Sequence, residues 1–299
     1  MTSEFSYASS VRGPFKRALA HGVEYVSGQH RLARIYAFYR RGPSGRNFWD
    51  DALRHLKVSV EIGGLGLSAI PRDGPVVFVA NHPYGALDGI ALAWAAGCVR
   101  SDTRILAHSA LARIPETREY LFPIDFAGTR EAERANVASR SAALAHLKAG
   151  GAVIIFPSGA VMTTPTPLAT RAEDLPWGPL TARLIARSGA TVVPVFFPGQ
   201  NSRLFQIASH ISATVRTALL YRETLRHRGR RIAMHVGAPI SVAELRAEPH
   251  AGALMALLRA RTFALTDASR GRPADHGPDG NAGRLAAALA PRRIGISSP

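Results

Sequence analysis

The chain has 299 residues, a length that fits one large domain or two small ones. Hydrophobic residues make up 46% and the mean hydropathy is +0.01, which excludes a polar disordered chain and a multi-pass membrane protein. Lys and Arg number 37 against 21 Asp and Glu, so the formal net charge is +16. A surface this basic attracts nucleic acid, an anionic membrane or phosphorylated ligands, unless the arginine richness is only compositional.

Other counts narrow the class further. The single cysteine, Cys98, makes no intrachain disulfide and no cysteine zinc site, and the histidines show no metal-ligand spacing. The first residues hold no apolar core of signal-peptide length. No run approaches the ~18 consecutive apolar residues of a spanning helix. We therefore expect a metal-free protein that is soluble or attached to one membrane face.

Residues 1–50 form a basic segment with eight Lys or Arg and three acids. Apolar side chains at helical spacing predict one or two amphipathic helices in it. Residues 51–267 are expected to form the main domain. The tail, 268–299, turns to Gly, Pro, Asp, Arg and Ala, a composition that predicts disorder.

Strands and helices alternate along the main domain. Strands are predicted over 56–62, 75–80, 104–108, 121–126, 152–156, 191–197 and 231–236. Helices are predicted over 130–148, 179–188, 211–228 and 241–265. This alternation predicts an α/β fold in which helices cover both faces of a mostly parallel central sheet.

Residues 204–231 place apolar side chains at helical spacing among several arginines. One interpretation is a basic amphipathic helix that lies on an anionic bilayer. The other is a helix packed on the core with a solvated face, and we favour it because most amphipathic helices in α/β domains cover a sheet. Residues 1–50 are then the better candidate for membrane contact.

The most informative segment is Asn81 to Gly89, with the sequence NHPYGALDG, directly after the apolar run 75–80. In open α/β sheets, ligand sites lie just beyond the carboxyl ends of strands. His82 is therefore placed where a substrate can reach it. A histidine has an unperturbed pKa of about 6.5, which suits a general base.

An aspartate follows this histidine at a distance that a turn can close. Pro83 and Gly85 permit such a turn, which would bring Asp88 back to His82. The carboxylate would accept from one ring nitrogen and leave the other free to take a proton. The alternative is that His82 is an ordinary strand-end histidine and Asp88 a helix cap.

Four later blocks accompany this segment in a recognisable order. They are LFPID at 121–125, IIFPSG at 154–159, VVPVFF at 192–197 and GAPI at 237–240. Together with NHPxGxxDG, they resemble the glycerolipid and lysophospholipid acyltransferase family, whose prototype acylates lysophosphatidic acid. The block GQNSRLF at 199–205 is similar to the hemolysin-like bacterial branch. The resemblance covers roughly residues 50–265.

The resemblance implies an O-acyltransferase that moves a fatty acyl group from acyl-CoA or acyl carrier protein to a hydroxyl of a lysolipid-type acceptor. It makes His82 the general base and Asp88 the residue that orients it. It implies no metal or other cofactor. The expected partners are the lipid acceptor, the acyl donor and an anionic membrane surface at the cytoplasmic face of the inner membrane, and not nucleic acid.

Residues expected to bind substrate come from these blocks and, for Arg130, from the loop after the strand 121–126. They are Asn81, Gly85, Arg130, Phe156, Pro157, Ser158, Gly159, Asn201 and Arg203. Arg130 and Arg203 are included because they offer cations, and Ser158 and Gly159 because they offer hydroxyl and backbone donors to an anion.

Two departures from the family pattern bear on this interpretation. Five residues separate His82 from Asp88, where the family usually has four; the hemolysin-like branch shares the longer form. The family block FPEGTR is FPSGAV at 156–161, so its glutamate and arginine are missing. Because an arginine binds phosphate bidentately, this loss argues against lysophosphatidic acid. It also keeps open a non-catalytic protein that binds anionic lipid or nucleic acid.

Overall fold

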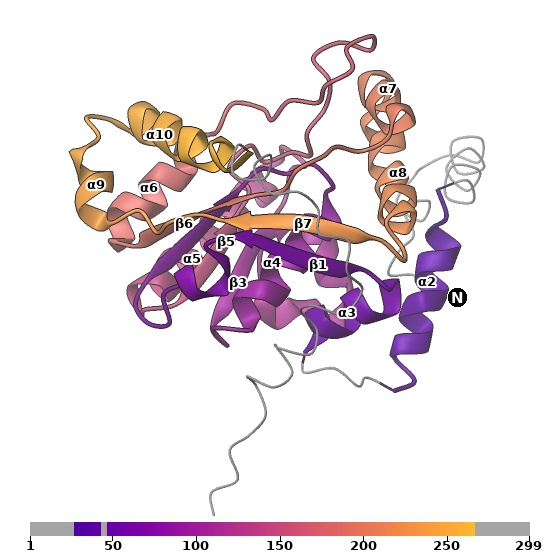
Figure 1. Ribbon diagram of the computed structural model, residues 1–299, viewed down its shortest axis with the longest axis horizontal. Helices are drawn as coiled ribbons and strands as arrows, with labels where there is room; N and C mark the ends of the chain where they lie inside the picture. The colour runs from indigo at the N-terminus through magenta and orange to yellow at the C-terminus, as the bar shows by residue number, and fades with distance from the viewer. Residues whose placement is uncertain (1–26, 43–46, 267–299) are drawn as a thin grey trace, which may run out of the picture. The chain divides into compact units, whose positions relative to one another are not determined.

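The structure, a computed structural model, describes residues 27–42 and 47–266 (Figure 1). Within them, strands form a seven-stranded sheet with the order β1-β7-β6-β2-β5-β3-β4. The strands are β1 (Ser59–Gly64), β2 (Val76–Ala80), β3 (Thr103–His108), β4 (Leu121–Ile124), β5 (Ala152–Ile155), β6 (Thr191–Phe196) and β7 (Arg231–Val236). Neighbouring strands are parallel except β6 and β7. The predicted mostly parallel α/β sheet is confirmed.

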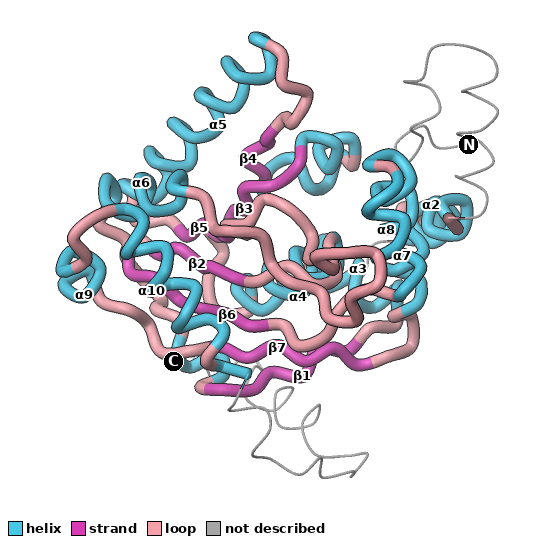
Figure 2. Tube along the Cα trace, turned by 90° about the horizontal axis from the view of Figure 1, so that it is seen from above, coloured by secondary structure: helices cyan, strands magenta, loops and turns pink. Residues whose placement is uncertain are grey.

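Helices cover both faces of this sheet (Figure 2). They are α2 (Gln29–Tyr39), α3 (Phe48–Leu56), α4 (Ala86–Gly97), α5 (Arg130–Lys148), α6 (Pro179–Ser188), α7 (Arg203–Ile211), α8 (Ala213–Arg226), α9 (Val242–Ala247) and α10 (Ala251–Phe263). Single 3-10 turns lie at Gly66–Ala69, Ser109–Arg113 and Pro115–Tyr120. Helices α3 and α4 pack on one face, and α5, α6 and α10 pack on the other.

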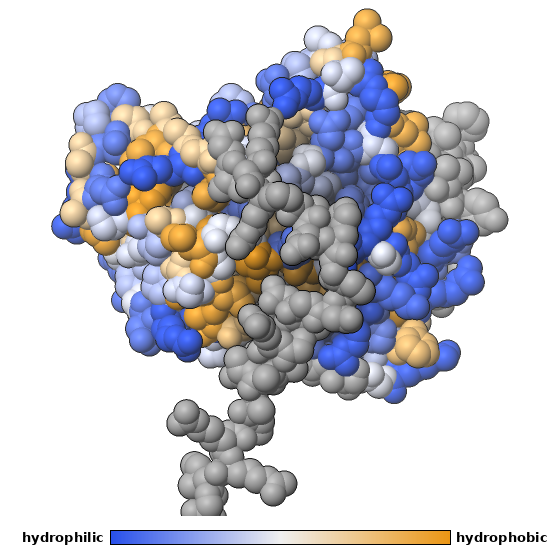
Figure 3. Space-filling view, in the orientation of Figure 1, coloured by the Kyte–Doolittle hydropathy of each residue, from blue (hydrophilic) through white to orange (hydrophobic). Residues whose placement is uncertain are grey.

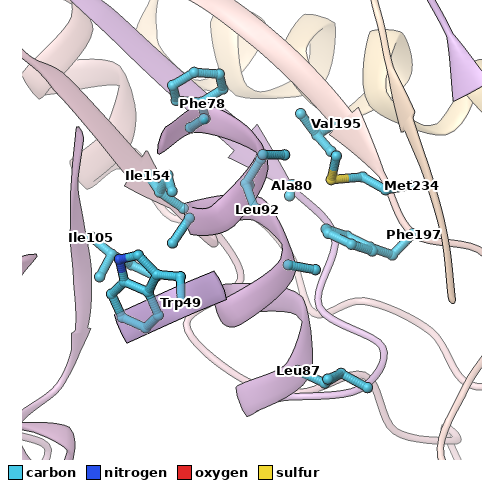
Figure 4. Packing of buried hydrophobic residues seen from close by; sticks show 14 of the residues in the cluster. Trp49, Phe78, Ala80, Leu87, Leu92, Ile105, Ile154, Val195, Phe197 and Met234 are labelled. Carbon is cyan, nitrogen blue, oxygen red and sulfur yellow. The ribbon is translucent and has the colours of Figure 1, made fainter. Parts of the chain in front are cut away.

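The strand β2 lies at the centre of the core. All five of its residues are buried, and successive side chains point to opposite faces of the sheet. Phe78 and Ala80 pack with Trp49 and Leu92 on the α3–α4 side (Figure 4). Val77 and its alternate neighbours pack on the other side. A continuous apolar run is what a strand covered on both faces requires.

The helix expected over 211–228 is confirmed as α8, and α7 is an additional helix directly before it. Ser212 separates the two: it has an extended φ of −157° and its side chain caps α8 by accepting from the backbone N–H of Val215. The final helix expected over 241–265 is divided between α9 and α10. Pro249 lies in the break, where its ring removes a backbone donor.

The first helices of the described chain are joined to the main domain. Helix α2 lies against α3 and α8, and its Tyr36 and Tyr39 are buried. Helix α3 crosses residue 50, the expected domain boundary, and its Trp49 is buried in the core. The predicted domain division stays a prediction. Residues 1–26 and the tail 268–299 lie outside the described residues.

Candidate active site

The site begins where β2 ends, at the carboxyl edge of the parallel strands. Neighbouring β5 and β6 end at the same edge, so the residues that follow these strands meet the residues that follow β2. Phe156 follows β5, and Phe197 follows β6. The sheet therefore brings together three of the sequence blocks that lie far apart in the chain.

Asn81 fixes the start of this turn. Its side-chain Nδ2 donates to the carbonyl of Phe197 at 2.8 Å, and its Oδ1 accepts from the N–H of Phe197 at 2.7 Å. The carbonyl of His82 accepts from the N–H of Met162 at 2.8 Å. Asn81 is 1% exposed, so its amide holds the backbone beside His82 in place rather than facing solvent.

The chain then reverses sharply at Gly85. Its φ of 83° and ψ of −122° lie in a region that side chains rarely adopt. A Cβ there would also stand only 3.0 Å from Leu220 Cδ2 and 3.2 Å from Val161 Cγ2. The N–H groups of Tyr84 and Gly85 both donate to Asp88 Oδ2, at 2.8 and 2.9 Å. Asp88 thus closes the turn and caps the start of α4.

The predicted pair is formed. His82 Nδ1 lies 3.1 Å from Asp88 Oδ2, a contact that is an ion pair when the ring is protonated. The carboxylate is fully buried, and the imidazole is 18% exposed. One face of the imidazole stacks on Phe156, with ring centroids 4.0 Å apart and planes at 28°. A proton on Nδ1 would leave Nε2 free to accept one.

Burial dominates the electrostatics of this turn. It raises the pKa of the Asp88 carboxyl, against the opposing effects of His82 and of the two backbone donors. Burial, together with the nearby Asp88, also raises the pKa of Tyr84 to about 12. The Tyr84 hydroxyl donates to the carbonyl of Pro198, and its ring packs on His227 of the α8 C-terminus. An ionised Asp88 in this setting favours the imidazolium that forms when His82 takes a proton.

A second buried carboxylate, Asp174, lies near the same histidine, and no sequence motif includes it. Its Oδ2 accepts from the indole Nε1 of Trp177 at 2.8 Å, and its Oδ1 has no partner in the described residues. Burial raises the pKa of Asp174, while Trp177, the Ser158 hydroxyl and the charge of His82 act to lower it. Asp174 therefore belongs to the surroundings of the histidine and to those of the FPSGAV block.

The altered block forms a tight turn. Pro157, Ser158 and Gly159 connect β5 to a long loop, and Gly159 has a φ of 67°. The Ser158 hydroxyl donates to the carbonyl of Ala160 at 3.0 Å. The carbonyl of Pro157 accepts from the N–H of Gly178 at 3.1 Å, which closes the base of the loop.

A cation from another element lies beside this block. Arg216 of α8 donates through Nη2 to the carbonyl of Val161 at 3.0 Å. Burial lowers the pKa of this guanidinium, and no carboxylate in the described part of the chain pairs with it. Val161 occupies the position at which the family block has its arginine. The sequence analysis missed Arg216 because it lies more than fifty residues from that block.

The two arginines chosen from the sequence lie elsewhere. Arg203 donates to the carbonyls of Ala169 and Pro167, the latter at 2.7 Å, so it holds the long loop. Arg130 is the exposed first residue of α5, after β4. Because β4 is three strands from β2, that position is roughly 14 Å across the sheet from the turn that holds His82 and Asp88. Binding of the acceptor by either arginine stays a prediction.

Asn201, another predicted binding residue, is buried. It is 2% exposed, and its side-chain oxygen and nitrogen have no partner in the described residues. Within the same ranges, no group of three or more His, Cys, Asp or Glu is arranged to hold a metal ion. No helix in these parts of the chain has the length and apolar character needed to cross a membrane.

The fold and the site define an α/β protein with a histidine–aspartate pair at the carboxyl edge of its sheet, which is an arrangement for activating a hydroxyl. A family model described as acyltransferase matches residues 31–270. The chain belongs to this acyltransferase family.

Two curated relatives carry the same name, lyso-glycine lipid O-acyltransferase. The protein of Phocaeicola vulgatus is 26% identical over 208 residues, which cover 66% of this chain and 69% of that protein. The protein of Bacteroides thetaiotaomicron is 24% identical over 208 residues, covering 66% and 71%. Among solved structures, the 1-acyl-sn-glycerophosphate (LPA) acyltransferase PlsC of Thermotoga maritima matches with a TM-score of 0.47 and 18% identity, over 89% of this chain and 86% of that one.

Replacing Asp88 by Asn should lower the acyl transfer rate by ~10²–10⁴-fold. An Asn oxygen still accepts from the two backbone donors of the turn, but it gives no charge to support an imidazolium. Steady-state kinetics measure the loss. Asp73→Asn, in an exposed loop, is the matched control. A rate within twofold of wild type for Asp88→Asn would contradict the role of this carboxylate.

Replacing Asp174 by Asn should make the protein's stability depend less on pH. The pKa of Asp174 is raised by burial, so above about pH 4 its carboxyl binds more protons in the folded wild type than in the unfolded chain. The wild type therefore loses stability as pH rises from about 4 through the raised pKa. The free energy of unfolding of the Asn variant, relative to wild type, should therefore increase with pH. Urea unfolding at several values between pH 4 and 7 measures this difference.

Asp102 provides a control in which the change of stability with pH has the opposite sign. A hydrogen bond from Arg100 lowers its pKa, so its charge stabilises the fold above the unfolded pKa and loses that effect as pH falls. Asp102→Asn should lose stability relative to wild type as pH rises toward about 5, and the difference should stay constant above that. A difference for Asp174→Asn that is constant from pH 4 to 7 would show that its carboxyl titrates alike in both states.

Proposed function

We propose that this acyltransferase moves a fatty acyl group from a thioester, carried by CoA or acyl carrier protein, to a hydroxyl of a lysolipid-type acceptor. The observation that carries the proposal is the contact between His82 and the buried Asp88. This contact pairs Nδ1 of the imidazole with the carboxylate and leaves Nε2 free for the acceptor hydroxyl. The names of the two relatives, which are lysolipid O-acyltransferases, support the acceptor class.

The proposed reaction uses His82 twice. Nε2 accepts the proton of the acceptor hydroxyl while the oxygen attacks the thioester carbonyl. Asp88 orients the ring and supports the imidazolium. When the tetrahedral intermediate collapses, the C–S bond breaks and the leaving thiolate takes the proton back from Nε2. The products are an ester and a free thiol, and the chemistry needs no metal or other cofactor.

We propose that the acceptor carries an anionic headgroup, phosphate or carboxylate, which Arg216 binds. The guanidinium is partly buried and donates to the carbonyl of Val161, next to the residue that bonds the His82 backbone. Removing an arginine from water without a carboxylate partner is costly, and a bound anion offsets that cost. The enzyme would work as a peripheral protein at the cytoplasmic face of the inner membrane, where such lipids lie.

The test of the activity is transfer of a labelled acyl chain by the purified protein. Acyl-CoA and acyl carrier protein serve as donors, with a panel of lysolipids that have phosphate, carboxylate or neutral headgroups. We expect transfer to anionic lysolipids, and a loss of at least about 10²-fold in His82→Ala. His55→Ala, in α3, is the control. Unchanged transfer by His82→Ala refutes the mechanism, and no transfer from either donor favours a protein that only binds lipid.

The test of the headgroup is Arg216→Met. A hydrogen-bonded charge pair contributes about 1.5–3 kcal/mol, so the KM for an anionic lysolipid should rise by roughly 10- to 100-fold, with a much smaller effect on kcat. Arg216→Lys should restore part of this loss, and Arg134→Met, on the exposed side of α5, should change neither constant. An equal KM in Arg216→Met and wild type would place the headgroup elsewhere.

A further inference from the structure

We propose that α7 and the adjoining loop tip form a surface that inserts into an anionic phospholipid bilayer. We call the four side chains that form it the interfacial patch, and it is distinct from residues 1–50. The patch consists of Leu168, 87% exposed, Leu204, 48%, Ile207, 40%, and Ile211, 76%. Single exposed aliphatic residues are ordinary, but a contiguous group marks a contact surface.

Helix α7 has two apolar faces. Phe205 and Ala208 are buried, and they pack in a cluster with Val161 and Leu219. Leu204, Ile207 and Ile211 follow one another at intervals of three and four residues, so they share the opposite face. A helix that only covers a core has polar residues on that outer face. Both α7 and α8 pack on the core as expected, with Ala218 and Leu219 of α8 buried, but the outer face of α7 carries three exposed aliphatic side chains that core packing does not explain.

The loop tip is held against the start of this helix. Arg203 donates to the carbonyls of Pro167 and Ala169, which flank Leu168. Gln200 also binds the loop, since its Oε1 accepts from the N–H of Ala172 and its Nε2 donates to the carbonyl of Thr170, both at 2.8 Å. The loop and α7 lie together at the upper right of Figure 1, and in that corner of Figure 3 exposed hydrophobic residues alternate with hydrophilic ones. The patch is thus preformed.

The charge around the patch selects an anionic bilayer. Residues 203–231 include seven arginines and one acid, Glu223. The side chain of Glu223 is 0% exposed and pairs with Arg222 and Arg226, so solvent meets almost only positive charge on these helices. Two adjoining clefts between α2 and α8, of about 500 and 430 Å³, are lined by further arginines, including Arg31 and Arg34. Exposed aliphatic side chains flanked by arginines match the interface of an anionic membrane.

The patch is connected to the catalytic turn. The N–H of Met162, at the start of the same loop, bonds the carbonyl of His82. Arg216 of α8 reaches the carbonyl of Val161. Insertion of the patch would therefore bring a bilayer to the elements that surround His82, where a lipid acceptor would enter. The surface itself is argued from exposure and charge, and does not depend on the proposed reaction.

The experiment is vesicle flotation of the full chain, as wild type and as a variant in which the patch is removed. In the test variant, Leu168, Ile207 and Ile211 are replaced by Ser. In the control variant, Phe38, Phe126 and Val137 are replaced by Ser; these are 63%, 60% and 59% exposed and lie on other elements. The vesicles are phosphatidylglycerol with phosphatidylethanolamine, or phosphatidylcholine alone, and thermal unfolding checks the fold of each variant.

We expect wild type to bind the anionic vesicles and to bind phosphatidylcholine weakly, with binding falling as salt rises. The test variant should lose binding by about tenfold or more, because three aliphatic side chains no longer leave water, and the control variant should lose less than about twofold. His82→Ala should bind as wild type does, so a failed reaction and a failed membrane contact are separable.

Three results would overturn the proposal. Equal vesicle binding by a folded test variant would place membrane contact elsewhere, for example in residues 1–50. Absence of vesicle binding by wild type, with a dimer in light scattering that the test variant loses, would assign the patch to a second copy of the chain. In Ile211→Trp, an emission spectrum that neither shifts to the blue nor is quenched by brominated phosphatidylglycerol would show that the patch stays in water.

Discussion

The site depends on one buried carboxylate oxygen, Asp88 Oδ2. It meets three nitrogens, the backbone N–H groups of Tyr84 and Gly85 and Nδ1 of His82. A buried charge is tolerated only when such donors compensate it. The same oxygen therefore closes the turn, caps the start of α4 and contacts the imidazole of His82. This sharing accommodates five residues between His82 and Asp88, because the left-handed Gly85 takes up the reversal.

The parallel sheet brings together the residues that surround this turn. Strands β5 and β6 end beside β2, so Phe156 stacks on His82 and Phe197 bonds Asn81. The two hydrogen bonds of Asn81 join segments 116 residues apart. Neither contact is local in sequence, yet both follow from the rule that ligand sites form at the carboxyl ends of parallel strands. The turn is therefore tied to both strands that neighbour β2.

Much of this was predictable, for physical reasons that differ between elements. The strands and the helix 130–148 stand out because buried strands need apolar runs and helices have clear ends, and His82 and Asp88 stand out because one turn joins them. Asp174 and Arg216 were not predictable, because they belong to a loop and a helix that lie far from the NHPxGxxDG motif in the sequence. Ser212 was overlooked as a helix cap within an apparently continuous helix. Periodicity shows which residues of α7 share a face, but not which face is covered.

At one end of the sheet, carboxylates are buried and aliphatic side chains are exposed. Asp88 and Asp174 are buried, each with its pKa raised by desolvation, while Ile211 and Leu168 are largely exposed. Burying carboxylates and exposing aliphatic side chains both lower the free energy of unfolding, so a protein selected only for folding would do neither. Both features are accounted for if, as proposed, His82 accepts the proton of a lipid hydroxyl that comes from a bilayer. Asp88 would then orient the histidine, and the exposed aliphatic side chains would contact the bilayer.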